Sequence, residues 1–277
     1  MGSLRLAVHT SAIQDLPGGG QFSPTTSTLV IGPTESVLVD TQYLPHEVDQ
    51  VIEQIELSGT RLVSIFVTHA HADHYFGLQR LLDRYPTARA YALPSVAAAI
   101  AAELPAHRHQ WAGLFEGSAL DNTIVPESLH TDTLHVDGHE LRVIELPQAD
   151  IGPTGIVHIP DLRAVVAGDV AYNGINPFLA ATGPDQWQRW IDSIDTIAAL
   201  DPETVIAGHK RPELSDSSAC LQTTRSYIEA FTTAVTKTDN TRELVAGMTT
   251  RFPDHGNPSA LVASAATALK RKKHARG

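Results

Sequence analysis

Short apolar runs alternate with helical patterns along the first 210 residues of the chain. The run at 62–67 is rich in β-branched residues and predicts a buried strand. Apolar side chains then recur at helical spacing from Phe76 to Leu82, so a helix is expected to begin near Tyr75. The same reasoning predicts further strands at 4–8, 28–31, 36–40, 90–93, 140–146, 155–159, 164–167 and 204–207, and further helices at 46–57, 94–101 and 186–200. This alternation argues for an α/β sheet with helices outside it.

The C-terminal part of the chain has a different pattern. From Ser217 three helical patterns continue to the end, and no Pro- or Ser-rich linker precedes them. We therefore predict one α/β domain over 1–212 and a helical extension over 213–277 packed on the same domain. The basic run at 270–273 follows a helical pattern, and we expect its cations to lie at the negative end of that helix.

Composition and charge restrict the partners of the chain. Its 277 residues are 42% hydrophobic and 18% charged, which is typical of a globular protein. The formal net charge of −11 argues against nucleic acid, and no apolar run approaches the roughly 20 residues that cross a bilayer. Cys220 is the only cysteine, which excludes an intrachain disulfide and a multi-thiolate metal site. A cytoplasmic location and a small-molecule substrate are expected, for a monomer or a homodimer.

A cluster of polar side chains follows the strand predicted at 62–67. His69 and His71 are two positions apart and project the same way from an extended backbone, so they can bind one metal ion. Asp73 and His74 follow at once and turn into a second pocket beside it. Three histidines and a carboxylate within six residues favour a metal site over a polar turn.

Three further polar positions come at the ends of predicted strands. Gly168-Asp169 ends the strand that begins at 164, and His209 follows the strand at 204–207. Asp40 ends the strand at 36–40, where it could support a metal ligand or form a turn or cap.

These motifs, in this order, resemble the metallo-β-lactamase fold superfamily over about residues 4 to 210. The resemblance implies an αββα sandwich of two mixed sheets with metals at one rim. It also implies that His69 and His71 bind the first metal, that Asp73, His74 and His209 bind the second, and that Asp169 bridges both. In having an aspartate at the bridging position, the chain resembles the glyoxalase, lactonase and phosphodiesterase branches of the superfamily.

The chain departs from that family at one ligand. A third histidine usually completes the first site in the loop after the strand that ends here at Leu146, but this chain has Gln148 at that position. An amide oxygen is a poorer zinc ligand than an imidazole nitrogen. The site could therefore hold two metals with one weak position, hold a single metal on the Asp73 side, or be degenerate. Asp150 is a candidate substitute for the missing ligand.

The resemblance predicts a metal-dependent hydrolase of a small ester, lactone or thioester. One or two Zn²⁺ ions are expected, with iron or manganese as alternatives, and a zinc-like ion lowers the pKa of bound water towards about 7. Asp73 would orient the resulting hydroxide or pass its proton to the leaving group. Tyr172 either points at the substrate carbonyl, as in lactone-hydrolysing members, or packs in its loop. The alternatives are a redox or lyase-type member and a non-catalytic binding relative.

One segment lacks a clear pattern. Between 106 and 133 the periodicity weakens, and His107, His109, Trp111 and Phe115 fall in this segment. It could be a lid over the substrate, but a surface insertion with two solvated histidines is the favoured interpretation.

Overall fold

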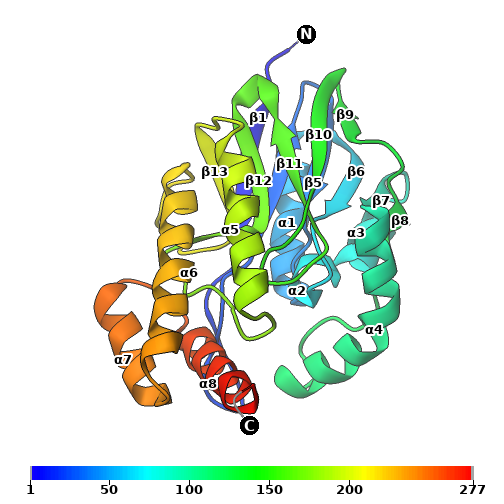
Figure 1. The fold of residues 1–277 in the computed structure, drawn as a ribbon. Coiled ribbons are helices and arrows are strands. Elements are labelled where there is room, and N and C mark those ends of the chain that lie inside the picture. Colours follow the sequence, from blue (N-terminus) through cyan, green and yellow to red (C-terminus); the bar gives the residue numbers. More distant parts are fainter. Residues whose placement is uncertain (1, 276–277) are drawn as a thin grey trace.

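Two β-sheets form the centre of the protein in the computed structural model, which describes residues 2–275 (Figure 1). The first sheet contains, in spatial order, β1 (Arg5–Thr10), β4 (Thr26–Ile31), β5 (Glu35–Val39), β6 (Arg61–Val67), β7 (Arg89–Ala92) and β8 (Glu127–Ser128). The second contains β13 (Thr204–Lys210), β12 (Ala164–Asn173), β11 (Thr154–Ile159), β10 (His139–Leu146) and β9 (Thr133–Val136). A small hairpin pairs β2 (Gln14–Asp15) with β3 (Gln21–Phe22).

Helices cover the outer faces of both sheets, so the predicted αββα sandwich is confirmed. Figure 1 shows α1 (Pro45–Ser58), α3 (Leu78–Arg84) and α4 (Pro94–Leu114) with the first sheet. The second sheet carries α5 (Pro184–Ala198) and α6 (Ala219–Lys237). The short α2 (Ala72–Tyr75) follows β6, and a 3₁₀ turn (Pro160–Leu162) joins β11 to β12.

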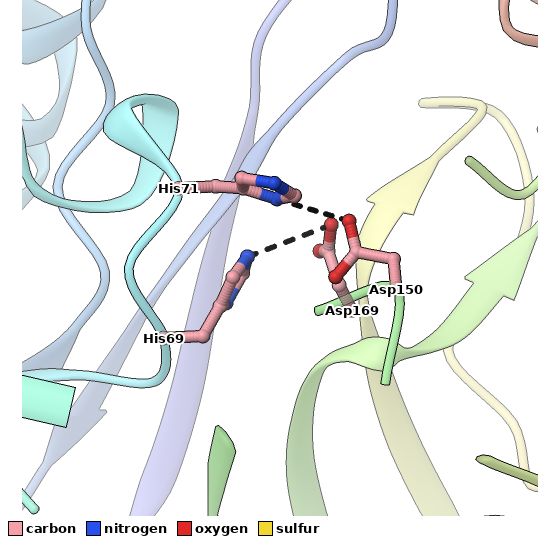
Figure 2. A group of neighbouring side chains, drawn as sticks. All are labelled: His69, His71, Asp150 and Asp169. Atoms are coloured by element: carbon pink, nitrogen blue, oxygen red, sulfur yellow. Dashed lines mark ion pairs between the residues drawn. The ribbon is translucent and has the colours of Figure 1, made fainter. Parts of the chain in front are cut away.

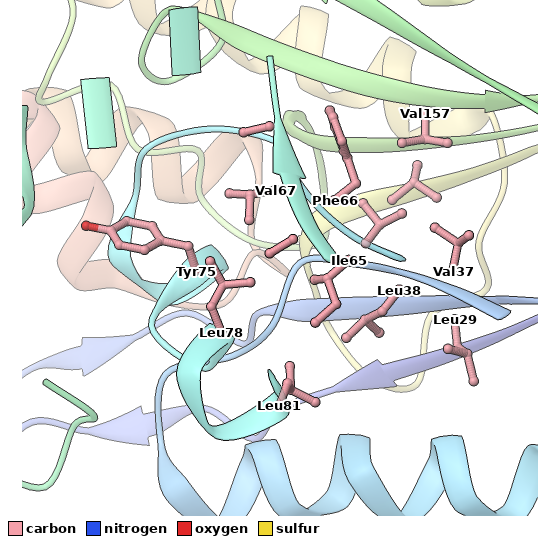
Figure 3. Close-up of a cluster of buried hydrophobic side chains, with 14 of the residues drawn as sticks. Leu29, Val37, Leu38, Ile65, Phe66, Val67, Tyr75, Leu78, Leu81 and Val157 are labelled. Atoms are coloured by element: carbon pink, nitrogen blue, oxygen red, sulfur yellow. The ribbon is translucent and has the colours of Figure 1, made fainter. Parts of the chain in front are cut away.

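Apolar side chains fill the space between the sheets and under the helices. Figure 3 shows one such cluster, in which Phe66 and Ile65 of β6 lie near Leu38 of β5, and Val157 of β11 reaches it from the second sheet. Phe66, Ile65 and Leu38 are fully buried. Burial of such a side chain contributes about 1.5–3 kcal/mol to folding. The alternating strand patterns of the sequence therefore lead directly to this core.

Parallel pairing of neighbouring strands places the strand ends that carry candidate metal ligands on the same side of each sheet. β5, β6 and β7 are parallel neighbours, and β12 is parallel to β13. One expectation was wrong in detail, because Asp169 lies inside β12 rather than at its end. β12 continues to Asn173 through register shifts on both sides of Gly168, which has a φ of 50°. The glycine permits this left-handed conformation, and the irregularity turns Asp169 towards the metal loop.

The helix predicted at 94–101 is longer than expected. It continues through Pro105 to Leu114, with Ile100, Leu104 and Trp111 buried on its inner side. Part of the poorly patterned 106–133 segment is therefore helical. The favoured interpretation of that segment as a surface insertion fails at Trp111 and Phe115, which are buried, and holds for His109, which is exposed.

Three helices follow β13, as predicted: α6, α7 (Thr241–Arg251) and α8 (Pro258–His274). α6 packs on β12, and α8 contacts β3. Two cations of the basic run bind backbone carbonyls: Arg271 donates to Thr182 O, and Lys272 Nζ lies 2.7 Å from Val235 O, near the end of α6. The domain boundary at residue 212 stays a prediction. In the part of the chain that the structure describes, no helix combines the length and apolarity needed to cross a bilayer.

Candidate metal centre

The polar cluster follows the C-terminal end of β6, an inner strand of the first sheet. β6 stops at Val67. The single helix expected from near Tyr75 is divided in the structure, because α2 covers Ala72–Tyr75 and α3 begins only at Leu78. His69 forms an isolated bridge with Thr154 of the second sheet. Asp73 and His74 lie in α2, where the backbone is helical rather than extended, and both are buried.

Four side chains form a first ligand group, shown in Figure 2: His69, His71, Asp150 and Asp169. One potential ligand atom from each lies within 4.8 Å of the others. His71 Nδ1 is 2.9 Å from Asp150 Oδ2, and His69 Nε2 is 3.7 Å from Asp169 Oδ2. Two imidazoles and two carboxylates suit a divalent transition-metal ion.

Asp73, His74 and His209 form a second ligand group with the same spacing. Asp169 lies between the two groups, because its Oδ1 is 3.3 Å from His74 Nε2 and its Oδ2 is 3.0 Å from His209 Nε2. This position is compatible with the bridging role expected of Asp169, which stays a prediction.

The residues fit a metal ion, because three buried ligand atoms have no hydrogen bond, and the 3.3 Å contacts of His74 Nε2 join it only to other potential ligands. His69 Nε2, His74 Nε2 and Asp169 Oδ1 are buried and have no hydrogen bond. A buried polar atom without a partner costs about 1–3 kcal/mol, so such atoms normally mark a missing ligand or ion. Divalent cations held by these residues would satisfy all three atoms.

Hydrogen bonds on the far sides of the imidazoles fix which nitrogen faces the centre. His74 Nδ1 is 2.8 Å from Asp40 Oδ2, and His209 Nδ1 is 2.8 Å from Pro24 O. Asp40 also accepts hydrogen bonds from the Thr68 backbone amide and hydroxyl, and that hydroxyl lies 2.9 Å from His69 Nδ1. Of the two roles weighed for Asp40, the support of a ligand is therefore the one that the geometry gives.

The loop after β10 presents Asp150, rather than Gln148, to His71. Gln148 is buried, and its amide nitrogen donates to Ala149 O over 3.1 Å. This contact does not favour Gln148 as a metal ligand. The expectation that Gln148 occupies the ligand position stays a prediction. Only the loop backbone decides which of the two side chains reaches the centre, so the sequence could name Asp150 as a candidate and no more.

Burial and opposite charges shift the titration of these groups. Burial would lower the pKa of His71, but the Asp150 carboxylate outweighs it and raises that pKa to about 9. Burial raises the pKa of Asp150 to about 6, against the opposing effect of His71. For Asp169, His209 and His74 outweigh burial and hold the carboxyl pKa well below its usual range. The centre is therefore built from ionised carboxylates facing histidines, an arrangement that a cation can enter as the protons leave.

Tyr172 lies behind the ligands. Its phenol donates to Asp169 Oδ2 over 2.9 Å and lies 3.4 Å from Asp150 Oδ2, and the side chain is buried. Burial, with Asp150 next, raises the pKa of this phenol well above its usual value. The geometry gives Tyr172 the role of orienting two carboxylates, and its direct catalytic role stays a prediction.

Two contacts around the centre were not found from the sequence. The Thr25 hydroxyl donates to Asp73 Oδ2 over 2.9 Å, and the Phe178 ring meets the His71 ring at 6.3 Å between centroids. The expectation that His107 is solvated is wrong, because its side chain is only 13% exposed and its Nδ1 lies 2.8 Å from the Tyr75 hydroxyl. No local pattern marks these residues, because each contact joins segments far apart in the chain.

Known proteins share both the sequence pattern and the fold. A model of the metallo-beta-lactamase superfamily matches residues 20–209. A hydroxyacylglutathione hydrolase of Cereibacter sphaeroides is 30% identical over 181 residues, which are 65% of this chain and 59% of that protein, so the chain spans less than two thirds of its relative. An atrochrysone carboxyl ACP thioesterase of Aspergillus chevalieri is 35% identical over 71 residues, 25% of this chain and 23% of that protein.

Solved structures support the same fold at low sequence identity. A metallo-beta-lactamase family protein of Thermus thermophilus has a TM-score of 0.66 at 19% identity, covering 98% of this chain and 94% of its own. The metallo-beta-lactamase FIM-1 of Pseudomonas aeruginosa, solved in a mono-zinc form, has a TM-score of 0.61 at 17% identity, covering 82% and 92%.

Proposed function

Since this chain belongs to the metallo-beta-lactamase superfamily, we propose that it is a metal-dependent hydrolase that cleaves a small ester, lactone or thioester. Two relatives named as a hydroxyacylglutathione hydrolase and an acyl-carrier-protein thioesterase support a thioester or ester substrate. The proposal rests on one observation: His69, His74 and Asp169 each have a buried ligand atom without a hydrogen bond.

The chain's own residues divide the work. His69, His71, Asp150 and Asp169 would hold one ion, and Asp73, His74 and His209 a second, with Asp169 between them. A divalent ion held here would make water acidic enough to act as a nucleophile at neutral pH and would polarise the scissile carbonyl.

Asp73 is the proposed proton acceptor. The neighbouring His74, whose Nε2 lies 3.3 Å from Asp73 Oδ2, outweighs burial and lowers the pKa of Asp73, so this carboxylate is ionised at neutral pH. The Thr25 hydroxyl donates to its Oδ2 and fixes its orientation. Asp73 can therefore orient the nucleophile and return a proton to the leaving group. Tyr172, protonated at neutral pH, keeps Asp169 and Asp150 in place.

Zinc is the proposed metal, with iron or manganese as the alternatives that the two carboxylates of the first ligand group allow. We further propose a cytoplasmic chain that acts on a small molecule without nucleic acid or membrane, alone or as a homodimer. Its single cysteine, Cys220, is buried, in accordance with a reducing compartment.

The test combines metal content with turnover. Protein purified without added metal is analysed by plasma mass spectrometry and assayed on p-nitrophenyl esters, an acyl-thioester and a lactone. Asp169→Asn should lose metal and activity together, because it removes charge from between both ligand groups. Gln148→Ala and Asp150→Asn separate the two candidate ligands: loss of metal from Asp150→Asn, with metal retained in Gln148→Ala, assigns the position to Asp150. Wild-type protein that holds metal but cleaves none of these bonds would refute the hydrolase proposal.

A further inference from the structure

His71 is the most exposed residue of the two ligand groups. Its side chain is 24% exposed, whereas those of the other six ligand-group residues are at most 8% exposed. We therefore expect a substrate to reach the centre past His71. The residues that surround His71 on this side decide which substrates fit.

An aromatic ring forms the wall beside His71. Phe178 is half-buried and meets the His71 ring at 6.3 Å with an interplanar angle of 70°. His71 forms its ion pair with Asp150, on the side of the ligands. The Phe178 ring therefore supplies an apolar surface in contact with the most exposed ligand.

The C-terminal helices hold Phe178 in this position. Phe178 belongs to the loop of residues 174–183 between β12 and α5. Asn176 of this loop donates its backbone amide and its side-chain amide to Gly256 O, at 3.0 and 2.9 Å. Its side-chain oxygen accepts a hydrogen bond from the hydroxyl of Tyr227, on α6, over 2.9 Å.

A second attachment follows on the other side of Phe178. The Leu179 backbone amide donates to Ser264 Oγ of α8 over 2.9 Å. Both neighbours of the Phe178–Pro177 pair are therefore fixed by buried hydrogen bonds to the C-terminal extension. A ring held in this way loses little conformational entropy when a ligand packs on it.

We propose that Phe178, held by the Asn176 and Leu179 attachments, forms a subsite that selects uncharged, apolar acyl groups. This inference rests on the proposed hydrolase function and adds its substrate class. The C-terminal extension, which adds no ligand to either group, then has a role in the site through the loop that it fixes.

The first experiment measures chain-length preference. We would compare kcat/KM for p-nitrophenyl acetate and p-nitrophenyl octanoate in wild type, Phe178→Ala and Phe178→Leu. Removing the ring should lower the octanoate value by about tenfold through KM and leave acetate within about twofold, the scale of discrimination by apolar pockets. Leucine should restore part of the preference. Tyr85→Ala, which removes another half-buried aromatic ring from the α1–α3 layer, is the matched control.

A second variant tests the attachment without removing the wall. Tyr227→Phe deletes only the hydroxyl that binds Asn176, so it should shift the octanoate-to-acetate ratio in the same direction while metal content stays constant. An unchanged ratio in Phe178→Ala would overturn the proposed subsite.

Binding of the product acids separates this inference from the proposed function. Calorimetry with octanoate and acetate on the metal-loaded protein needs no turnover. Octanoate that binds wild type about tenfold more tightly than Phe178→Ala supports the subsite even if no ester is cleaved. Equal octanoate affinity in both proteins overturns it even if esters are cleaved.

Discussion

Asp40→Asn should disrupt metal binding without changing any ligand. Asp40 has a φ of 61°, a left-handed conformation that asparagine tolerates well, so the backbone is expected to stay in place. The carboxylate receives three hydrogen bonds: Oδ1 accepts from Thr68 N at 2.9 Å, and Oδ2 accepts from Thr68 Oγ1 and His74 Nδ1, both at 2.8 Å. An amide of the same shape can accept only on one side.

The replaced side chain forces a change of tautomer. Its oxygen must face the Thr68 backbone amide, so its NH₂ group faces His74 Nδ1, which then has to accept a hydrogen bond. The imidazole proton moves to Nε2, the atom that would bind metal. The Thr68 hydroxyl also loses its acceptor and can turn to donate to His69 Nδ1, with the same result in the first ligand group. One substitution thus protonates a ligand atom on each side of the centre.

The size of the effect follows from these contacts. Loss of a single outer partner of a metal ligand typically costs about 10–100-fold in affinity, and two ligands are affected, so we expect about 100-fold or more. The unfolding free energy should fall by only about 1–3 kcal/mol, the cost of an unsatisfied buried group. Chelator competition measures the affinity, and ¹⁵N NMR of the imidazoles reports the tautomers. Asp49→Asn, an exposed acid paired with Arg80, is the control.

A metal affinity within twofold of wild type in Asp40→Asn would refute this reasoning. An NMR spectrum in which His74 Nε2 remains unprotonated would do the same, because the tautomer is the proposed cause.

Two further predictions concern packing and pH. Gly208→Ala should lower the unfolding free energy by about 1–3 kcal/mol, since its Cβ would lie 2.0 Å from Asp169 Oδ1. The control is Gly113→Ala, which has open space around it and should be neutral or stabilising in chemical denaturation. Equal changes in unfolding free energy for the two variants would contradict the packing argument. The buried carboxylate of Glu47 lies 2.7 Å from His9 Nε2, and this hydrogen bond lowers the pKa of Glu47 against the effect of burial. The ionised carboxylate therefore stabilises the fold above about pH 4.5, and this stabilisation is lost as the pH falls through the lowered pKa. Glu47→Gln should therefore cost about 1–3 kcal/mol at pH 7 and less near pH 3, and a pH-independent cost would exclude this origin.

Much of this architecture could be predicted from local patterns. The apolar run at 62–67 and the alternation at 140–146 are both strands, because side-chain period and burial agree there. The cluster from His69 to His74 lies at a strand end, as expected. Asp169 was placed at a strand terminus because a glycine before it suggests an end, whereas the pairing with β13 carries β12 onward.

Other features depend on contacts that no local pattern contains. Whether Gln148 or Asp150 reaches His71 is decided by the path of one loop. The position of Phe178 depends on hydrogen bonds to Tyr227 and Ser264, between 49 and 86 residues farther along the chain. The helix predicted at 94–101 is shorter than α4 because Pro105 disfavours a helix interior and the periodicity weakens after it, although burial of Trp111 stabilises the second half.

The ligands come from both sheets, and this division has a consequence for the lifetime of the protein. His69, His71, Asp73 and His74 follow a strand of the first sheet, whereas Asp150, Asp169 and His209 belong to the second. A bound cation would cross-link the two halves of the chain, and separation of the sheets would require its release. The unfolding rate would then depend on free metal concentration, so a cell short of metal would degrade the protein faster. The amount of this protein in the cell would then vary with the metal supply.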